Sequence, residues 1–208
     1  MNLPDSMVFV VDSDPICCLN IAEIASSLNL RCSTFSTAEE FLGQLDPAQP
    51  GCAIVELWLP GMSGFELQEC LAKRDIPIPI IFVSATADVA TAVRAMRNGA
   101  HILLKKPYLA EELAQSIRDA VDRDRRTRAA LAQRAEMRYR FDRLHDRERE
   151  TLQLVLDGVP NKTIARKLGV SRRTVERIRA TAFEKLGAES ALDVVRMSSE
   201  FGSANSES

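Results

Sequence analysis

Long apolar stretches are missing from this chain of 208 residues. No run of about 18 consecutive apolar residues occurs, which argues against a membrane-spanning helix. The first residues also lack the basic-then-apolar order of a secretory signal peptide. We therefore expect a cytoplasmic protein with no membrane partner.

Paired cysteine spacing is missing as well. The sequence has neither a CxxC pair nor the spacing of a zinc site. The five cysteines all fall early in the chain, at Cys17, Cys18, Cys32, Cys52 and Cys70. In a reducing compartment we interpret them as small buried apolar residues. A redox switch through the adjacent Cys17 and Cys18 is the alternative, although adjacent thiols bond each other only with strain.

The charges are unevenly distributed, although the net charge is only −2. Residues 1–120 carry 8 Lys and Arg against 15 Asp and Glu, whereas residues 138–197 carry 14 against 9. An acidic front and a basic back are typical of a sensor joined to a nucleic-acid binder. The basic part has no nucleophile–base pair and no metal-ligand cluster, so we do not expect an enzyme.

Three helices are predicted in the basic part. Residues 147–156 repeat apolar positions at helical spacing, and the segment 158–160 ends that helix. A short helix follows from Asn161, and a turn containing Gly169 leads to a further helix with Ser171 as its N-cap. This order predicts a helix-turn-helix, which places its last helix in a DNA groove.

The last of these helices has two distinct faces. One stripe is apolar and is expected to be core: Val175, Ile178, Ala182 and Leu186. The opposite face is expected to meet base edges: Arg173, Glu176, Arg177 and Ala180. Arg177 suits guanine, and Glu176 suits the amino group of cytosine. Three further cations are expected at phosphates: Lys162, Lys167 and Arg172. The alternative is a small helical domain with a solvated basic face.

The block from Leu144 to Met197 resembles the LuxR-type helix-turn-helix domain of FixJ- and NarL-like response regulators. The resemblance rests on Arg147-Glu148-Arg149-Glu150, Gly158, Asn161-Lys162-Thr163-Ile164-Ala165, Leu168-Gly169-Val170-Ser171, Thr174-Val175-Glu176 and Lys185-Leu186. It implies a transcription regulator that binds double-stranded promoter DNA as a homodimer, with RNA polymerase as a further candidate partner. Two positions depart from the family. His145 stands where a Thr usually caps the first helix, so Asp146 is expected to cap one residue later, and Ile178 replaces a frequent His.

The front part alternates strand and helix signals. Five buried strands are predicted: Met7–Val11, Arg31–Phe35, Cys52–Leu57, Ile80–Val83 and Ile102–Leu104. Four helices are predicted between the strands. The first starts at Asp14-Pro15, and the second follows a capping box at Ser36-Thr37-Ala38-Glu39. The third spans Phe65–Ala72, and the fourth spans Asp88–Asn98 and is closed by Gly99. The fold class is therefore α/β, a doubly wound five-stranded parallel sheet, followed by a long linker helix and a small all-α domain.

Polar residues follow four of these strands at their carboxyl ends. They are Asp12, Ser13, Asp14, Glu56, Ser84 and Lys106, with Pro107 after the lysine. In an open parallel sheet this edge carries the site, so we expect the six side chains to cluster. Taken singly, each of them would be an ordinary surface residue.

This cluster, with Pro60-Gly61-Met62-Ser63-Gly64, resembles the receiver domain of response regulators over about residues 5–122. In that family an Asp accepts a phosphoryl group, two acidic residues hold Mg²⁺, a Ser or Thr and a Lys contact the phosphate, and the Lys-Pro bond is usually cis. The matching residues are Asp12, Ser84, Lys106 and Pro107. The departures are Glu56 for the phospho-acceptor, Ser13 for the second acid, and Leu103 for a mobile aromatic.

The departures change the expected chemistry. Mg²⁺ would lose one carboxylate beside Asp12, so a metal site of Asp12 and Asp14 is expected to be weak or absent, and no cofactor is required. An ion pair between Glu56 and Lys106, with Ser84 donating a hydrogen bond, would hold an activated-like arrangement without phosphate. The alternatives are that Glu56 only fills space in a dimerisation module, or that a cognate histidine kinase still phosphorylates the domain.

The linker completes the predicted organisation: receiver-like domain 1–122, linker helix 123–143, DNA-binding domain 144–200 and a disordered tail 201–208. Residues 122–128 include no apolar side chain, which predicts one long helix with a solvated middle or, alternatively, a hinge. Leu131, Ala135, Tyr139 and Phe141 are expected to pack against a second copy, against the DNA-binding domain, or only locally. The competing function is a protein-interaction module that no longer reads DNA.

Overall fold

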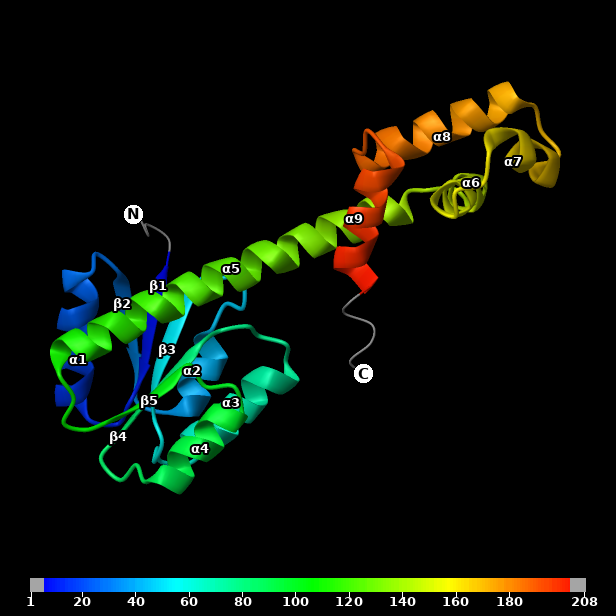
Figure 1. The fold of residues 1–208 in the computed structure, drawn as a ribbon. Helices are drawn as coiled ribbons and strands as arrows, with labels where there is room; N and C mark the ends of the chain where they lie inside the picture. The colour runs from blue at the N-terminus through cyan, green and yellow to red at the C-terminus, as the bar shows by residue number, and fades with distance from the viewer. Residues whose placement is uncertain (1–5, 203–208) are drawn as a thin grey trace. The chain divides into compact units, whose positions relative to one another are not determined.

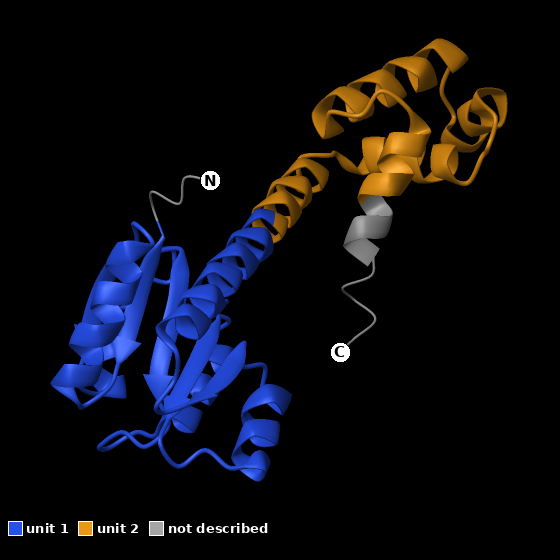
Figure 2. Ribbon diagram, turned by 60° about the vertical axis from the view of Figure 1, so that its left-hand side comes forward, with its two compact units in different colours: residues 1–129 blue, residues 130–208 orange. Residues whose placement is uncertain are grey.

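A computed structural model describes residues 6–202 of the chain. The chain divides into two compact units, residues 1–129 and residues 130–208 (Figure 2). Among the described residues, no helix combines the length and the apolar character needed to cross a bilayer.

The first unit is built on one parallel sheet, as the alternating pattern predicts. The strand order is β2-β1-β3-β4-β5, and all four pairings are parallel (Figure 1). The strands are β1 (Met7–Val11), β2 (Arg31–Phe35), β3 (Gly51–Glu56), β4 (Ile80–Ser84) and β5 (Ile102–Lys105). Each differs from its predicted range by at most one residue at either end. The carboxyl ends of β1, β3, β4 and β5 therefore meet at one edge, where the polar residues were expected.

Helices cover both faces of the sheet. They are α1 (Pro15–Ser27), α2 (Ala38–Gln44), α3 (Gly64–Lys73), α4 (Val89–Arg97) and α5 (Ala110–Asp142). Strand residues alternate between two apolar cores, because successive side chains of a strand point to opposite faces. Val8 and Val10 pack with α1 and α5, whereas Phe9 and Val11 pack with α2 and α3.

Two helix starts test the predicted caps. Asp14 caps α1 by accepting a hydrogen bond from the Ile16 amide at 2.9 Å, as expected. The box before α2 was misplaced by one residue. Thr37 is the N-cap and accepts from the Glu40 amide, while the Glu40 carboxylate accepts from the amide of Ser36. Glu39 instead accepts from the Met62 amide and so holds the loop after β3.

The cysteines are all free, but only Cys18 and Cys52 are buried. Cys17, Cys32 and Cys70 are partly exposed, so the interpretation of all five as core residues was wrong. Cys52 lies in β3 within the core, where burial raises the pKa of its thiol well above the ordinary value. Cys52 is therefore an apolar core residue without thiolate chemistry.

The long helix α5 confirms the predicted linker helix, and most of its charged middle is exposed as expected, but Asp124 is not. Asp124 is 1% exposed and accepts hydrogen bonds from the Gly51 amide and from Arg128, each at 2.9 Å. Arg128 also donates to the carbonyl oxygens of Pro47 and Gln49. This Asp124–Arg128 clamp fixes α5 to the segment that enters β3. The sequence pattern missed this clamp, because a charged residue without apolar neighbours is predicted to be exposed. In the structure the Asp124 charge is paired and hydrogen-bonded, which allows it to be buried.

Replacing Asp124 by alanine is expected to lower the free energy of unfolding by about 1–3 kcal/mol, because the Gly51 amide and the Arg128 guanidinium lose a buried acceptor. Urea unfolding of the full chain measures this. Asp122→Ala is the matched control, since the side chains of the Asp122–Arg125 pair are 35% and 48% exposed and such a pair is worth at most about 1 kcal/mol. Equal losses in the two variants would contradict a structural role for the clamp.

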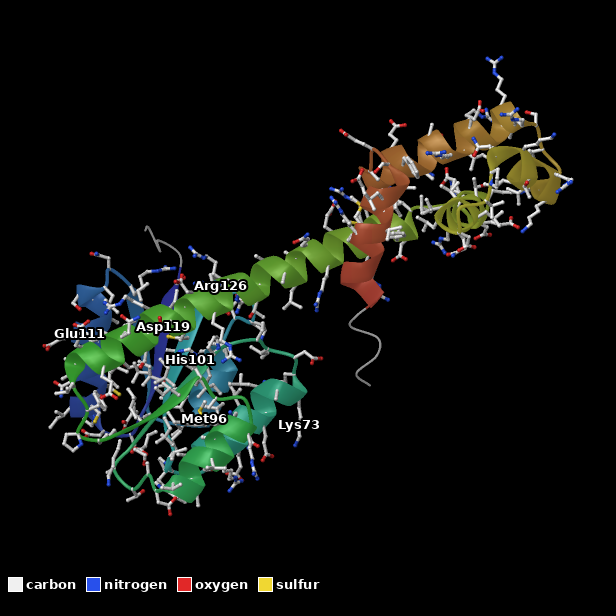
Figure 3. All side chains as sticks on the ribbon, viewed as in Figure 1. Lys73, Met96, His101, Glu111, Asp119 and Arg126 are labelled. Atoms are coloured by element: carbon white, nitrogen blue, oxygen red, sulfur yellow. The ribbon has the colours of Figure 1, made fainter. Side chains whose placement is uncertain are left out.

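The exposed surface of the first part of α5 is polar. Glu111, Asp119 and Arg126 follow one another along it (Figure 3). Farther on, Leu131 and Tyr139 are exposed, and Ala135 is too, so none of the three is buried by local packing. Phe141 differs, because it packs against the core of the second unit beside Leu144.

The second unit contains α6 (Asp146–Leu156), α7 (Asn161–Leu168), α8 (Arg172–Leu186) and α9 (Ala191–Gly202). Its main core is formed by Leu144, Leu152, Ala182, Phe183, Leu186 and Val194. Of the predicted tail, Phe201 and Gly202 belong to α9, and residues 203–208 lie outside the described residues.

The start of α6 departs from the expected cap. Asp146 does not cap the helix but is its first residue, and His145 occupies the N-cap position. The Glu148 carboxylate accepts a hydrogen bond from the His145 amide at 2.9 Å. A side chain three residues into the helix thus satisfies the amide at its start.

Candidate functional site

Three charged side chains meet at the carboxyl edge of the sheet. Lys106 follows β5, and its Nζ lies 2.6 Å from Oδ2 of Asp12, after β1, and 2.8 Å from Oε2 of Glu56, at the end of β3. All three side chains are less than one-fifth exposed. The Glu56–Lys106 ion pair expected from the sequence is therefore present, and Asp12 shares it.

The local charges favour the ammonium form of Lys106. Burial alone would lower the pKa of its ammonium group, but the hydrogen bonds to Asp12 and Glu56 and the charges of both carboxylates outweigh that effect. The pKa consequently lies above its ordinary value. One cation faces two anions, so the cluster carries a net negative charge.

The remaining carboxylate oxygens are also held in place. Oε1 of Glu56 accepts hydrogen bonds from the amides of Leu57 at 2.8 Å and Trp58 at 3.3 Å. Oδ1 of Asp12 accepts from the Asp14 amide at 2.9 Å. Every oxygen of the two carboxylates thus has a protein donor, which fixes both side chains.

Ser84 does not join this network, and the hydrogen bond expected from it is wrong. Its side chain is 1% exposed, and its Oγ has no hydrogen-bond partner among the described residues. Only its carbonyl takes part, by accepting from the Lys106 amide at 2.9 Å.

The two remaining acidic-loop positions face solvent. Ser13 and Asp14 are exposed, and the hydrogen bond from Ile16 lowers the pKa of the Asp14 carboxyl. Within residues 6–202, no group of three or more His, Cys, Asp and Glu side chains is arranged to hold a metal ion. Asp12 is paired to Lys106 and Asp14 caps α1, so each candidate Mg²⁺ ligand already has a protein contact.

Two further positions complete this edge. The peptide bond between Lys106 and Pro107 is cis. Leu103, on β5, is partly buried against the core that α2 and α3 cover.

Sequence reasoning missed two residues beside Lys106. Cys17 lies on the first turn of α1, and Tyr108 directly follows the cis proline; both line a cavity that also reaches Lys106. The sequence held one signal for each residue. Cys17 comes three positions after Asp14, within one helical turn, and Tyr108 comes directly after Lys106 and Pro107.

The second site is the pair α7 and α8. Gly169 ends α7 with a left-handed backbone (φ +66°), and Ser171 caps α8 by accepting from the Thr174 amide at 3.1 Å. Ile164 and Ala165 of α7 pack against Val175 of α8 in a small core. The expected helix-turn-helix is therefore formed.

The outer face of α8 is exposed. Arg173, Glu176, Arg177 and Ala180 are all exposed, and so are the three cations assigned to phosphates, Lys162, Lys167 and Arg172. On the inner face Val175, Ala182 and Leu186 are fully buried, whereas Ile178 is only partly buried. Phe183 was missed as a core residue, and Arg179 stacks on its ring at 5.1 Å.

A salt bridge near the C-terminal end of α8 holds this helix to α6. Lys185 Nζ lies 2.7 Å from Oε2 of Glu148 and also donates to the Arg143 carbonyl. Burial would raise the pKa of the Glu148 carboxyl, but the hydrogen bonds from Lys185 and the His145 amide outweigh it, so the pKa lies below its ordinary 4.5.

Glu148→Gln is expected to lower the free energy of unfolding of the second unit by about 1–3 kcal/mol at neutral pH, because Lys185 loses its charged partner. A lowered pKa in the folded state means that the stabilisation is present above pH 4.5 and is lost as the pH falls through the folded value. The difference between wild type and Glu148→Gln should therefore shrink in acid. Thermal unfolding of both chains across this range measures it, with the exposed Glu150→Gln as control.

The chain matches two family models and several known proteins. Residues 8–118 match the response regulator receiver domain, and residues 142–198 match the luxR family of bacterial regulatory proteins. Nodulation protein W of Bradyrhizobium diazoefficiens is 36% identical over 201 residues, which are 96% of this chain and 88% of that protein. The transcriptional regulatory protein FixJ of Azorhizobium caulinodans is 34% identical over 94% of this chain and 93% of its own length.

The solved structure of the response regulator StyR is also similar. It has a TM-score of 0.88 and 34% identity, and the match covers 94% of this chain and 99% of that one. The receiver match spans more than half of the present chain, and the helix-turn-helix match takes up most of the remainder. The chain therefore belongs to the response regulators that join a receiver domain to a LuxR-family helix-turn-helix.

Proposed function

We propose that this DNA-binding transcription regulator works without phosphorylation of an aspartate in its receiver. The observation that carries the proposal is the Glu56–Lys106 ion pair of 2.8 Å, with Asp12 on the other side of the same ammonium. The Glu56 carboxylate occupies the contacts that a phosphoryl-bearing side chain would otherwise make with Lys106.

The length of the Glu56 side chain supports the proposal. Glutamate is one methylene longer than aspartate, and in-line attack on phosphorus tolerates little displacement of the attacking oxygen. Both oxygens of Glu56 are also engaged, one with Lys106 and one with the amides of Leu57 and Trp58. These contacts hold both oxygens in place.

We propose further that Mg²⁺ binds weakly at most and that no cofactor is required. Asp12 and Asp14 are the two candidate ligands, and each already has another role, in the ion pair with Lys106 and as the cap of α1. Mg²⁺ prefers a near-octahedral set of oxygens, which these engaged carboxylates do not supply.

The position of Ser84 indicates that Glu56 is a structural replacement for the aspartate rather than a mimic of the phosphorylated state. Its Oγ is buried without a partner, whereas a mimic would bring this hydroxyl into contact with the carboxylate of Glu56. We therefore infer that Glu56 fixes the receiver in one arrangement and that the chain binds promoter DNA, as a homodimer, in that arrangement.

The test combines mass and DNA affinity. The full chain is incubated with acetyl phosphate and Mg²⁺, its intact mass is measured, and a palindromic promoter fragment is titrated at several salt concentrations before and after. We expect no added phosphoryl group, unchanged affinity, and binding that weakens as salt rises. A phosphorylated product with altered affinity would establish conventional control instead, and absence of salt-dependent binding would favour a protein-interaction module.

A further inference from the structure

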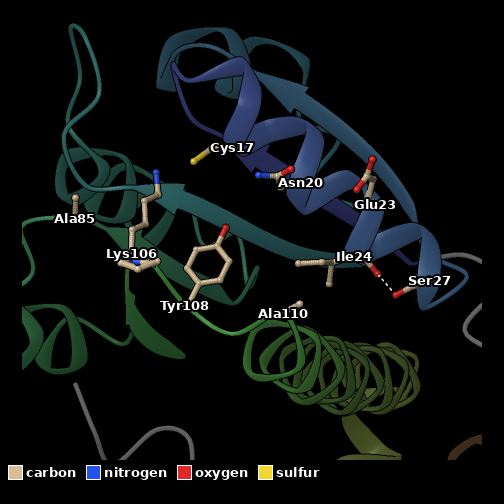
Figure 4. A pocket seen from close by; sticks show the side chains of 10 residues that line it. Cys17, Asn20, Glu23, Ile24, Ser27, Ala85, Lys106, Tyr108 and Ala110 are labelled. Atoms are coloured by element: carbon tan, nitrogen blue, oxygen red, sulfur yellow. Dashed lines mark hydrogen bonds between the residues drawn. The ribbon is translucent and has the colours of Figure 1, made fainter.

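A cavity of about 780 Å³ lies beside Lys106 in the first unit (Figure 4). One wall is α1, which contributes Cys17, Asn20 and Ile24, and the other is the segment from β5 into α5, with Lys106, Tyr108 and Ala110. Pockets that hold small molecules typically measure roughly 300–1,000 Å³, so the cavity is large enough for one.

The cavity combines apolar walls with two unused polar groups. Ile24, Ala110 and the ring of Tyr108 supply apolar surface. Figure 4 shows the Tyr108 hydroxyl directed toward the space between Cys17 and Asn20. Neither this hydroxyl nor the Asn20 amide is hydrogen-bonded to another of the described residues. A few convergent polar groups in an apolar cavity are the usual pattern of a ligand site.

The charges around the cavity select against anions. The Lys106 ammonium is already paired with Asp12 and Glu56, and Glu23 adds another carboxylate to the lining. A negatively charged ligand would therefore be repelled by the carboxylates. A neutral ligand has no charge to desolvate, so its entry costs little free energy.

We propose that this cavity binds a neutral, largely apolar small molecule whose single hydroxyl or carbonyl group hydrogen-bonds with Tyr108 and Asn20. The ligand would also touch Lys106, so occupancy would act on the ion pair with Glu56. This regulatory part rests on the proposed function, while binding itself does not.

The first experiment measures binding to the full chain at pH 7 with 2-naphthol, which is neutral and has one hydroxyl, and with 2-naphthoate, its anionic analogue. Amide chemical shifts in NMR locate the contacts. We expect saturable binding of 2-naphthol in the millimolar range or tighter, with shifts at Asn20, Ile24 and Tyr108. We also expect 2-naphthoate to bind at least ten-fold more weakly.

Two variants of matched size test the position of the site. Ala110→Trp fills the cavity from the N-terminal end of α5 and should abolish saturable binding. Ala72→Trp adds the same indole to an exposed position of α3, in the opposite layer, and should leave binding unchanged. Tyr108→Phe should weaken 2-naphthol several-fold without affecting the fold.

Three results would overturn the site: no saturation by 2-naphthol, equal affinity for 2-naphthoate, or shifts confined to the exposed Ile16 and Leu19 on the outside of α1. The regulatory part has its own measurement, DNA titration with and without 2-naphthol. Equal DNA affinity would overturn regulation and leave the binding data standing. Phosphorylation of the wild type would overturn the proposed function alone.

Discussion

Arg177→Ala is expected to weaken binding to the specific promoter sequence by about 1–3 kcal/mol, roughly 5- to 150-fold, and to relax the preference at one base position. Arg177 is exposed on the outer face of α8, while the inner face is fixed by the fully buried Val175, Ala182 and Leu186. A guanidinium at this place can donate two hydrogen bonds to guanine, and alanine can donate none. Competition binding with a set of promoter fragments, each changed at one base pair, measures both effects.

Two other variants separate base reading from general attraction. Lys162→Ala should lower affinity for every sequence and flatten the salt dependence, because a phosphate contact releases counterions whatever the base. Arg179→Ala, on the same helix as Arg177, should leave the preference unchanged, since Arg179 stacks on Phe183. If Arg177→Ala alters neither affinity nor preference, the DNA-contacting face of α8 has been misassigned.

Local patterns were enough to predict most of the fold. The strand ranges follow from short apolar runs that the sheet buries on both faces, as for β4, where every residue is buried. Helix starts follow from residues that cap with their own side chains, as at Asp14 and Ser171. These signals are local, because a cap or a run acts on amides within a few residues.

Two of the misses concern contacts between residues far apart in the chain. Asp124 is buried because Gly51, 73 positions away, presents an amide to it. Glu56 pairs with Lys106, 50 positions away, while the buried Ser84 hydroxyl contacts no hydrogen-bond partner among the described residues. The sequence supplied the residue types at the pocket, but the choice of hydrogen-bond partners depends on distances that only the folded chain defines.

Glu56→Gln is expected to have a large effect on the receiver, because it removes one of the two charges that hold Lys106. The side chains of Glu56 and Lys106 are only 13% and 18% exposed, so the loss is screened little by solvent. We expect a fall of about 1–3 kcal/mol in the unfolding free energy of the first unit, together with weaker dimerisation or DNA binding. Lys106→Ala should act in the same direction, since it leaves both Asp12 and Glu56 without their cation.

A substitution of Glu56 by aspartate tests the capacity for phosphorylation rather than the ion pair. Glu56→Asp alone shortens the side chain by one methylene, yet Ser13 still lacks the second carboxylate that Mg²⁺ needs, so we expect no response to acetyl phosphate. The double variant Glu56→Asp, Ser13→Asp supplies both groups, and its DNA affinity should depend on acetyl phosphate and Mg²⁺. Intact mass and DNA titration of the wild type, both single variants at position 56 and the double variant distinguish these cases. A labile phosphoryl group on wild-type Glu56 would contradict the chemistry proposed for it. Equal DNA affinity in wild type, Glu56→Gln and Lys106→Ala would instead make the receiver a passive scaffold, since the ion pair would then hold nothing that DNA binding requires.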